Sequence, residues 1–185
     1  MTLSKGQNSP RSAFQAAEGA DLATRKAFFE AIRKDDTAAV TKTLAQYPGA
    51  ICWQEPFKPE DKPFAADNTP LMTAAENRKG AIGSLLIDHG AAATMDQQNS
   101  RGWTALMFAS WHGVQEIAEK LLWAGADTQL RNEGNHDAAT MAGLRDHTHI
   151  KRMIEQHRQK HEGAAAFQSG TNKTLSVMPK IKIRK

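Results

Sequence analysis

The sequence of 185 residues contains a single cysteine, Cys52. One cysteine cannot form an intramolecular disulfide, and it excludes metal sites built from several cysteines. No stretch reaches the roughly 18 continuous apolar residues of a membrane-spanning helix, and the N-terminus lacks the apolar run of a secretory signal. These absences predict a cytoplasmic protein. The start of the chain is basic and has no acidic residue before Glu18. A targeting signal for an organelle or for secretion is therefore the alternative.

Sequence patterns that carry catalysis are also lacking. There is no glycine-rich phosphate loop, no nucleophile elbow and no pair of carboxylates suited to acid–base chemistry. The pairs His147/His149 and His157/His161 have spacings that metal ligands use, but no Glu or Cys cluster accompanies them. We therefore predict a protein that is not an enzyme, holds no metal or cofactor, and exposes these histidines to solvent.

Positive charge is concentrated at the C-terminal end of the chain. Residues 151–185 contain nine basic and two acidic side chains, whereas residues 1–150 contain 15 basic and 18 acidic ones. Residues 163–185 are expected to form a flexible basic tail that contacts nucleic acid or an anionic surface, or that is simply solvated. The last cations of this tail are Lys180, Lys182, Arg184 and Lys185.

An internal repeat dominates the middle of the chain. Two segments, beginning at Thr69 and Thr104, align without a gap at a constant spacing of about 35 residues. The matching pairs include Leu71 with Leu106, Met72 with Met107, Ala74 with Ala109, Ile82 with Ile117, Leu86 with Leu121, and Gly90 with Gly125. A fixed period of this length is typical of a solenoid built from small helical units.

Each part of the repeat has a local physical reason. The hydroxyl groups of Thr69 and Thr104 are placed to cap the N-terminus of a short helix. Apolar residues at helical spacing then predict a second helix, and Gly90 and Gly125 are suited to end it in the left-handed conformation. The pattern therefore predicts a helix–turn–helix unit.

This pattern resembles the ankyrin repeat, whose unit begins with T-P-L-H-x-A, although Met72 and Met107 stand where the family has His. Ala142 and Ile150 follow Ala109 and Ile117 at one common offset, and they extend the pattern toward the C-terminus. The resemblance implies an all-α solenoid of about four units over residues 24–162. An N-terminal extension (1–23) would precede it, and a long loop (52–67) would separate its first two units.

The resemblance also implies where a partner binds. In the ankyrin family, partners contact the hairpin tips and the exposed face of the first helix of each unit. Aromatic side chains on such a surface are typical of binding hot spots, although Phe108 is equally suited to packing, and Trp123 is expected to pack. By position, the predicted partner-binding residues are Asp67, Asn68, Glu76, Asn77, Arg101, Trp103, Phe108, Trp111 and His112.

The family resemblance implies a module that binds another protein and acts as an adaptor or regulator through its concave face and hairpin tips. Two alternatives stay open at the level of sequence. One is a subunit of a larger assembly, such as a ribonucleoprotein, anchored by the basic tail. The other is a secreted bacterial ankyrin effector. A fold of this kind serves many partners, so the fold alone does not choose among them.

Overall fold

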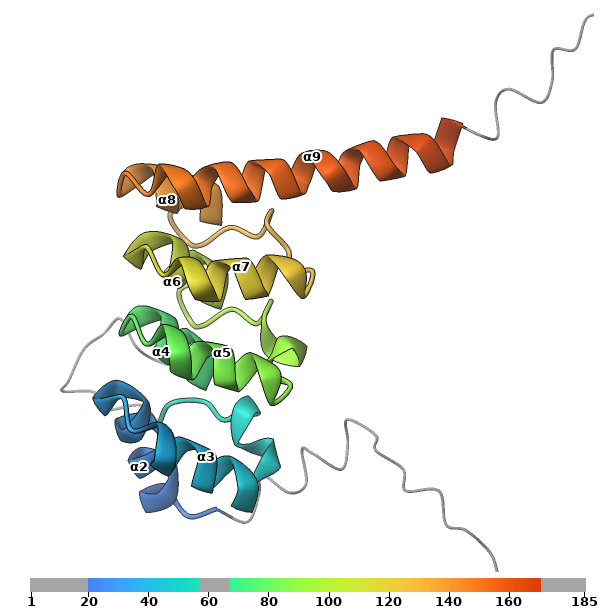
Figure 1. Cartoon of the computed structure of the whole chain (residues 1–185). Coiled ribbons are helices and arrows are strands. Elements are labelled where there is room, and N and C mark those ends of the chain that lie inside the picture. Colours follow the sequence, from blue (N-terminus) through green and yellow to red (C-terminus); the bar gives the residue numbers. More distant parts are fainter. Residues whose placement is uncertain (1–19, 57–66, 171–185) are drawn as a thin grey trace, which may run out of the picture.

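The computed structural model describes residues 20–56 and 67–170, with side chains up to residue 160, and all regular structure in these ranges is helical (Figure 1). The α-helices form four consecutive pairs, which confirms the predicted helix–turn–helix units. The pairs are α2 (Leu22–Lys34) with α3 (Thr37–Gln46), α4 (Pro70–Glu76) with α5 (Gly80–Asp88), α6 (Ala105–His112) with α7 (Gln115–Trp123), and α8 (Ala138–Leu144) with α9 (Thr148–Gly170). Two short 3-10 helices, η2 (Pro48–Cys52) and η3 (Ala91–Thr94), follow the first and second pairs.

The pairs stack on one another in chain order (Figure 1). The first helices make one row, in which α2 contacts α4, α4 contacts α6, and α6 contacts α8. The second helices make another row, in which α5 contacts α7 and α7 contacts α9. Each pair therefore buries apolar surface against its neighbours in the sequence, as the units of a solenoid do.

All four first helices begin with the same kind of cap. A side-chain oxygen of the residue before the helix accepts a hydrogen bond from the backbone N–H three residues later, which satisfies a donor that has no partner inside the helix. The capping distances are 2.8 Å for Asp21, 3.3 Å for Thr69, 3.2 Å for Thr104 and 2.8 Å for Asp137. The caps predicted at Thr69 and Thr104 are thus confirmed.

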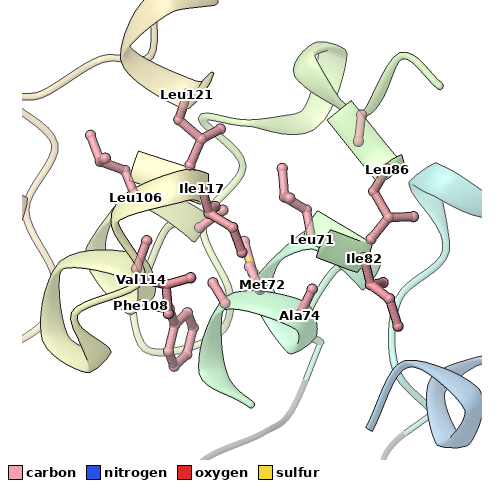
Figure 2. Close-up of a cluster of buried hydrophobic side chains, with 14 of the residues drawn as sticks. Leu71, Met72, Ala74, Ile82, Leu86, Leu106, Phe108, Val114, Ile117 and Leu121 are labelled. Carbon is pink, nitrogen blue, oxygen red and sulfur yellow. The ribbon is translucent and has the colours of Figure 1, made fainter. Parts of the chain in front are cut away.

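The predicted apolar repeat forms the core (Figure 2). The largest buried side chains of the two central units come from equivalent positions and are essentially inaccessible to solvent: Leu71, Met72, Ile82 and Leu86, and Leu106, Met107, Ile117 and Leu121. Ala74 and Ala109 are also fully buried, and their small size lets neighbouring first helices approach closely. Ala142 and Ile150 are buried as well, so the extension of the repeat to the last unit is confirmed.

Each turn from a first to a second helix contains one residue in the left-handed conformation. The φ angles are 65° at Asp35, 58° at Arg78, 74° at Gly113 and 58° at Asp146. Gly113 is the glycine of this set, and a Cβ placed on it would lie 2.6 Å from Cε1 of His147. The side chain of His147 therefore rests directly against the backbone of the preceding turn.

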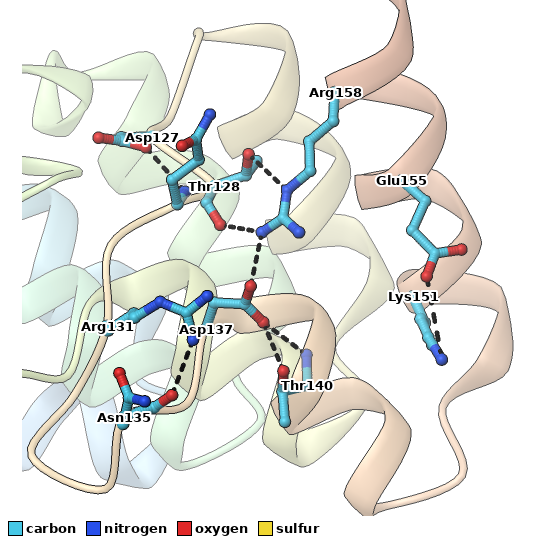
Figure 3. Close-up of polar contacts among 10 residues, drawn as sticks. Asp127, Thr128, Arg131, Asn135, Asp137, Thr140, Lys151, Glu155 and Arg158 are labelled. Atoms are coloured by element: carbon cyan, nitrogen blue, oxygen red, sulfur yellow. Dashed lines mark hydrogen bonds and ion pairs between the residues drawn. The ribbon is translucent and has the colours of Figure 1, made fainter.

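The last helix is longer than the sequence predicted. Helix α9 continues to Gly170, so the boundary expected at Glu162, and the start of the tail at residue 163, fall inside a helix. Arg158 attaches α9 to the preceding loop (Figure 3). Its Nη2 lies 3.0 Å from Oδ2 of Asp137 and its Nε lies 3.0 Å from Oγ1 of Thr128, while Nη2 also donates to the Thr128 carbonyl.

We expect Arg158→Ala to lower the free energy of unfolding by about 1.5–3 kcal/mol, because it removes hydrogen bonds to a largely buried carboxylate. Burial opposes the charged form of Asp137, but hydrogen bonds from Thr140 and Arg158 outweigh it and lower its pKa. A lowered pKa contributes stability above the unfolded value of about 4, and this contribution disappears as the pH falls through the folded value. Urea titrations measure the free energy of unfolding of the unchanged protein and of Arg158→Ala. The difference between them should be smaller at acidic than at neutral pH. The exposed Lys160→Ala is the control, and an equal loss there would contradict this role of Arg158.

Candidate protein-binding surface

Three aromatic rings meet at the third unit. The Trp103 ring centroid lies 4.8 Å from that of Phe108 and 6.1 Å from that of Trp111, and the two indoles are nearly perpendicular at 85°. Phe108 is only 7% exposed and forms the base of this group, whereas Trp103 and Trp111 are half-buried. We call these three residues the aromatic cluster. Its two indoles offer rigid, partly open apolar surface.

The fourth unit extends this surface. The guanidinium of Arg145, at the C-terminal end of α8, stacks on the Trp111 ring at 4.6 Å from the centroid. Leu144 beside it is 58% exposed. Sequence reasoning missed both residues, although Leu144 follows Trp111, and Arg145 follows His112, at the same offset that relates Ala142 to Ala109. Extending this repeat offset to the last unit would have placed them on the same face.

Two buried asparagines hold the hairpin tips in shape. Oδ1 of Asn99 accepts hydrogen bonds from the backbone N–H groups of Arg101 and Trp103 at 3.0 and 2.9 Å. Asn132, at the equivalent position of the next tip, accepts one from the backbone of His136 at 3.0 Å. These side-chain bonds to the local backbone fix the turns that present Trp103. Neither asparagine was predicted from the sequence, which pointed only to the tip residues themselves.

Asn68, predicted to bind a partner, is instead part of the interior. Its side chain is fully buried, accepts a hydrogen bond from Asn99 at 2.8 Å and donates one to Glu76 at 3.2 Å. A buried amide must be satisfied by such partners, so Asn68 links two tips rather than facing solvent. Phe108, for which the sequence left packing and binding open, is also buried and packs inside the protein.

The remaining predicted residues lie at or near the surface. Asp67 is exposed, whereas Glu76, Asn77, Arg101 and His112 are half-buried. The amide of Asn77 donates to the Thr73 carbonyl at 2.8 Å, which orients it along α4. The predicted tail contacts, Lys180, Lys182, Arg184 and Lys185, lie outside the described residues.

The prediction that Trp123 packs is wrong, because this side chain is 92% exposed. The apolar stripe of α7 includes Ile117 and Leu121, which are both buried. Trp123 follows Leu121 by two residues, which on an α-helix is a rotation of about 200° to the opposite side. The helical period already contained this information.

The described ranges also bear on metal binding, thiol reactivity and membrane insertion. No three His, Cys, Asp or Glu side chains come together there as a metal site would require. Burial raises the pKa of the Cys52 thiol, which disfavours the reactive thiolate. Between residues 20 and 170, outside the gap at 57–66, no helix is both long and apolar enough to cross a membrane.

The stacked helix pairs and the surface across their first helices define a helical-repeat solenoid. The family model described as ankyrin repeats (three copies) matches residues 28–132. This chain therefore belongs to the ankyrin repeat family, which confirms the resemblance seen in its sequence.

Known proteins share the repeat but differ in extent. The chain is 45% identical over 77 residues to the mouse ankyrin repeat and SAM domain-containing protein 6, and 44% identical to the rat protein over the same length. The match covers 41% of this chain and only 8% of either relative. A chain in the crystal structure of the yeast ribosomal protein Rps3 in complex with its chaperone Yar1 is similar in fold. The TM-score is 0.61 at 20% identity, over 72% of this chain and 92% of that one.

Proposed function

We propose that this chain is a non-enzymatic module that binds another protein and acts as an adaptor or regulator. The partner would lie on the face made by the first helices and the hairpin tips. Its central contact would be the aromatic cluster, which is the observation that carries the proposal. The family supports this function in general, and the yeast structure of similar fold contains a chaperone together with the protein it binds.

The aromatic cluster has the properties of a binding hot spot. Trp and Arg dominate such hot spots because they bury a large area at a modest cost in conformational entropy. Trp111 is held between the perpendicular Trp103 ring and the Arg145 guanidinium. A side chain that is already held in place loses little freedom when a partner covers it, which favours affinity.

The direct experiment is a nuclease-treated affinity pull-down from native lysate, with the captured proteins identified by mass spectrometry. We expect a stoichiometric protein to be captured by the full chain and by Trp123→Ala, the matched exposed tryptophan, but not by Trp111→Ala. Loss of a hot spot of about 2 kcal/mol lowers affinity roughly 30-fold. Capture that is unchanged by Trp111→Ala would contradict the proposed site.

Thermal unfolding of each variant separates binding from packing. Because Trp111 is half-buried, its replacement could also weaken the fold, and a large fall in melting temperature would show that it serves the core. Leu144→Asp then carries the test, since Leu144 is mostly exposed and occupies the position of the fourth unit that is equivalent to Trp111. Leu144→Asp should retain stability and lose the partner.

A second candidate, a subunit of a nucleic-acid assembly, rests on the basic C-terminal end. Residues 171–185 contain five basic side chains and no acidic one. Because α9 continues to Gly170, the informative truncation ends there rather than at Glu162. Capture that disappears with nuclease or with this truncation would favour the second candidate.

The cytoplasmic location of the protein stays a prediction from its sequence.

A further inference from the structure

Four basic or imidazole side chains meet at the turns between first and second helices. Arg78 occupies the α4–α5 turn, His112 ends α6, Arg145 ends α8, and His147 follows in the α8–α9 turn. Arg78 and His112 line one groove, and the His147 ring lies against Gly113, the residue after His112. Arg145 stacks on Trp111, the residue before His112, so the four groups lie near one another although they come from three units. We call these residues the turn edge.

A groove opens beside the turn edge. It has a volume of about 450 Å³ and lies between the α4–α5 and α6–α7 turns, with Arg78 and His112 in its lining. Glu116 contributes a carboxylate to this lining, but its Oε1 already accepts a hydrogen bond from Ser84 at 2.7 Å. The groove therefore has room for partner side chains next to the guanidinium of Arg78.

The two arginines of the turn edge have no acidic counterpart within the part of the chain that the structure describes. Among the described residues, neither Arg78 nor Arg145 forms an ion pair with a carboxylate, whereas cations elsewhere do: Lys79 pairs with Asp35, Lys120 with Asp88, and Arg158 with Asp137. Arg145 uses the face of its guanidinium on Trp111, which leaves the N–H groups at its edge for other acceptors. Two guanidiniums that form no ion pair with a described carboxylate are complementary to the carboxylates of a partner.

The turn edge is continuous with the proposed partner face, because Arg145 belongs to both. We propose that the partner protein presents an acidic segment, whose Asp and Glu side chains bind the turn edge while a neighbouring apolar side chain covers Trp111. This inference rests on the proposed function and specifies the chemistry of the partner. Complementary charge of this kind increases the rate of association and selects against basic partners.

His112 adds a proton-linked component to such binding. Burial, and then the charges of Arg78, Arg145 and His147, lower the pKa of His112, so this ring is neutral in the unbound protein at neutral pH. A bound carboxylate would favour the protonated ring, and affinity should therefore rise as the pH falls toward 6. The other charged groups on the elements around this ring are Lys79 in the α4–α5 turn, Glu116 on α7 and Asp146 in the α8–α9 turn.

The test uses random phage-displayed peptides of about 12 residues, selected on the full chain at low salt. Selected peptides, labelled with fluorescein, are then measured by fluorescence anisotropy. We expect them to be rich in Asp and Glu and to bind about tenfold or more weakly to Arg78→Glu/Arg145→Glu. The matched double reversal Lys26→Glu/Lys42→Glu, at exposed positions of α2 and α3, should change affinity less than about twofold.

Two further measurements strengthen the test. Affinity for an acidic peptide should fall as salt rises from about 50 to about 300 mM. It should rise as the pH falls from about 8 to about 6, and His112→Gln should abolish that rise.

The outcomes separate this inference from the proposed function. Peptides that require Trp111 but are not acidic, or that ignore the reversal of Arg78 and Arg145, would overturn the acidic segment and leave the protein-binding face in place. If Trp111→Ala also leaves the affinity of the peptides unchanged, both the acidic segment and the protein-binding face are overturned. A labelled single-stranded oligonucleotide of about 20 nucleotides is the third probe. The oligonucleotide would have to bind more tightly than any peptide and lose this binding in Arg78→Glu/Arg145→Glu. That result would assign the turn edge to nucleic acid instead.

Discussion

Ile117→Ala is expected to lower the free energy of unfolding by about 3 kcal/mol or more, the range seen when a fully buried aliphatic side chain is truncated. Ile117 is inaccessible to solvent and lies where α7 packs on α5 (Figure 2). In a solenoid, each unit is stabilised mainly through its neighbours, so this cavity also weakens the coupling between the second and third units. Urea unfolding followed by far-UV circular dichroism measures the effect.

The control for Ile117→Ala is Leu144→Ala, which removes a similar side chain from an exposed position. It should change stability by no more than about 0.5 kcal/mol. If the two variants were equally stable, Ile117 would not occupy the tightly packed position described here. A transition that broadens or splits in Ile117→Ala alone would confirm that the units have become uncoupled.

Gly83→Leu is expected to destabilise the protein by at least about 2 kcal/mol, even though leucine forms helices roughly 1 kcal/mol better than glycine. A Cβ placed on Gly83 would lie 2.3 Å from Cδ1 and 2.6 Å from Cγ1 of Ile117. Because Ile117 is buried, it has little room to move aside. Ala118 occupies the equivalent position of the next unit, so a single methyl group can be accommodated in this solenoid, and the larger side chain is the sharper test.

Gly143→Leu serves as the matched variant. A Cβ at Gly143 meets only the Lys151 side chain, at 3.6 Å, which is ordinary van der Waals contact at an exposed site. There the gain in helix propensity should dominate, and stability should stay constant or rise by up to about 1 kcal/mol. If Gly83→Leu were more stable than Gly143→Leu, this would contradict the close approach of α5 and α7 at Gly83.

The repeat was readable from sequence because its signals are local. Thr69 caps a helix through the backbone only three residues away, and the apolar positions of that unit follow a helical period. Trp123 was misread although the same period placed it opposite Leu121. The error came from expecting an aromatic residue near the end of the second helix to pack, and the sequence itself contained the correction.

Other features depended on contacts between units. Asn68 is buried because Asn99, in the next hairpin tip, donates a hydrogen bond to it, and a polar residue beside a turn gives no local sign of such a partner. The end of α9 was misplaced because the segment after Glu162, rich in glycine and alanine, resembles a linker. Arg158 attaches this helix to Asp137 and Thr128, and neither partner is a neighbour in the sequence.

By itself, the sequence determined the repeat, its helix caps, its apolar core and the family to which the chain belongs, because these follow from interactions within one unit and from the regular spacing of the units along the chain. Only the tertiary structure decided which polar residues are buried and which charges lie together. Stacking brings Arg78, His112 and Arg145 from three units to one edge and places Arg145 on Trp111. Distances across the stack depend on how each unit packs on the next, and residue order does not specify them.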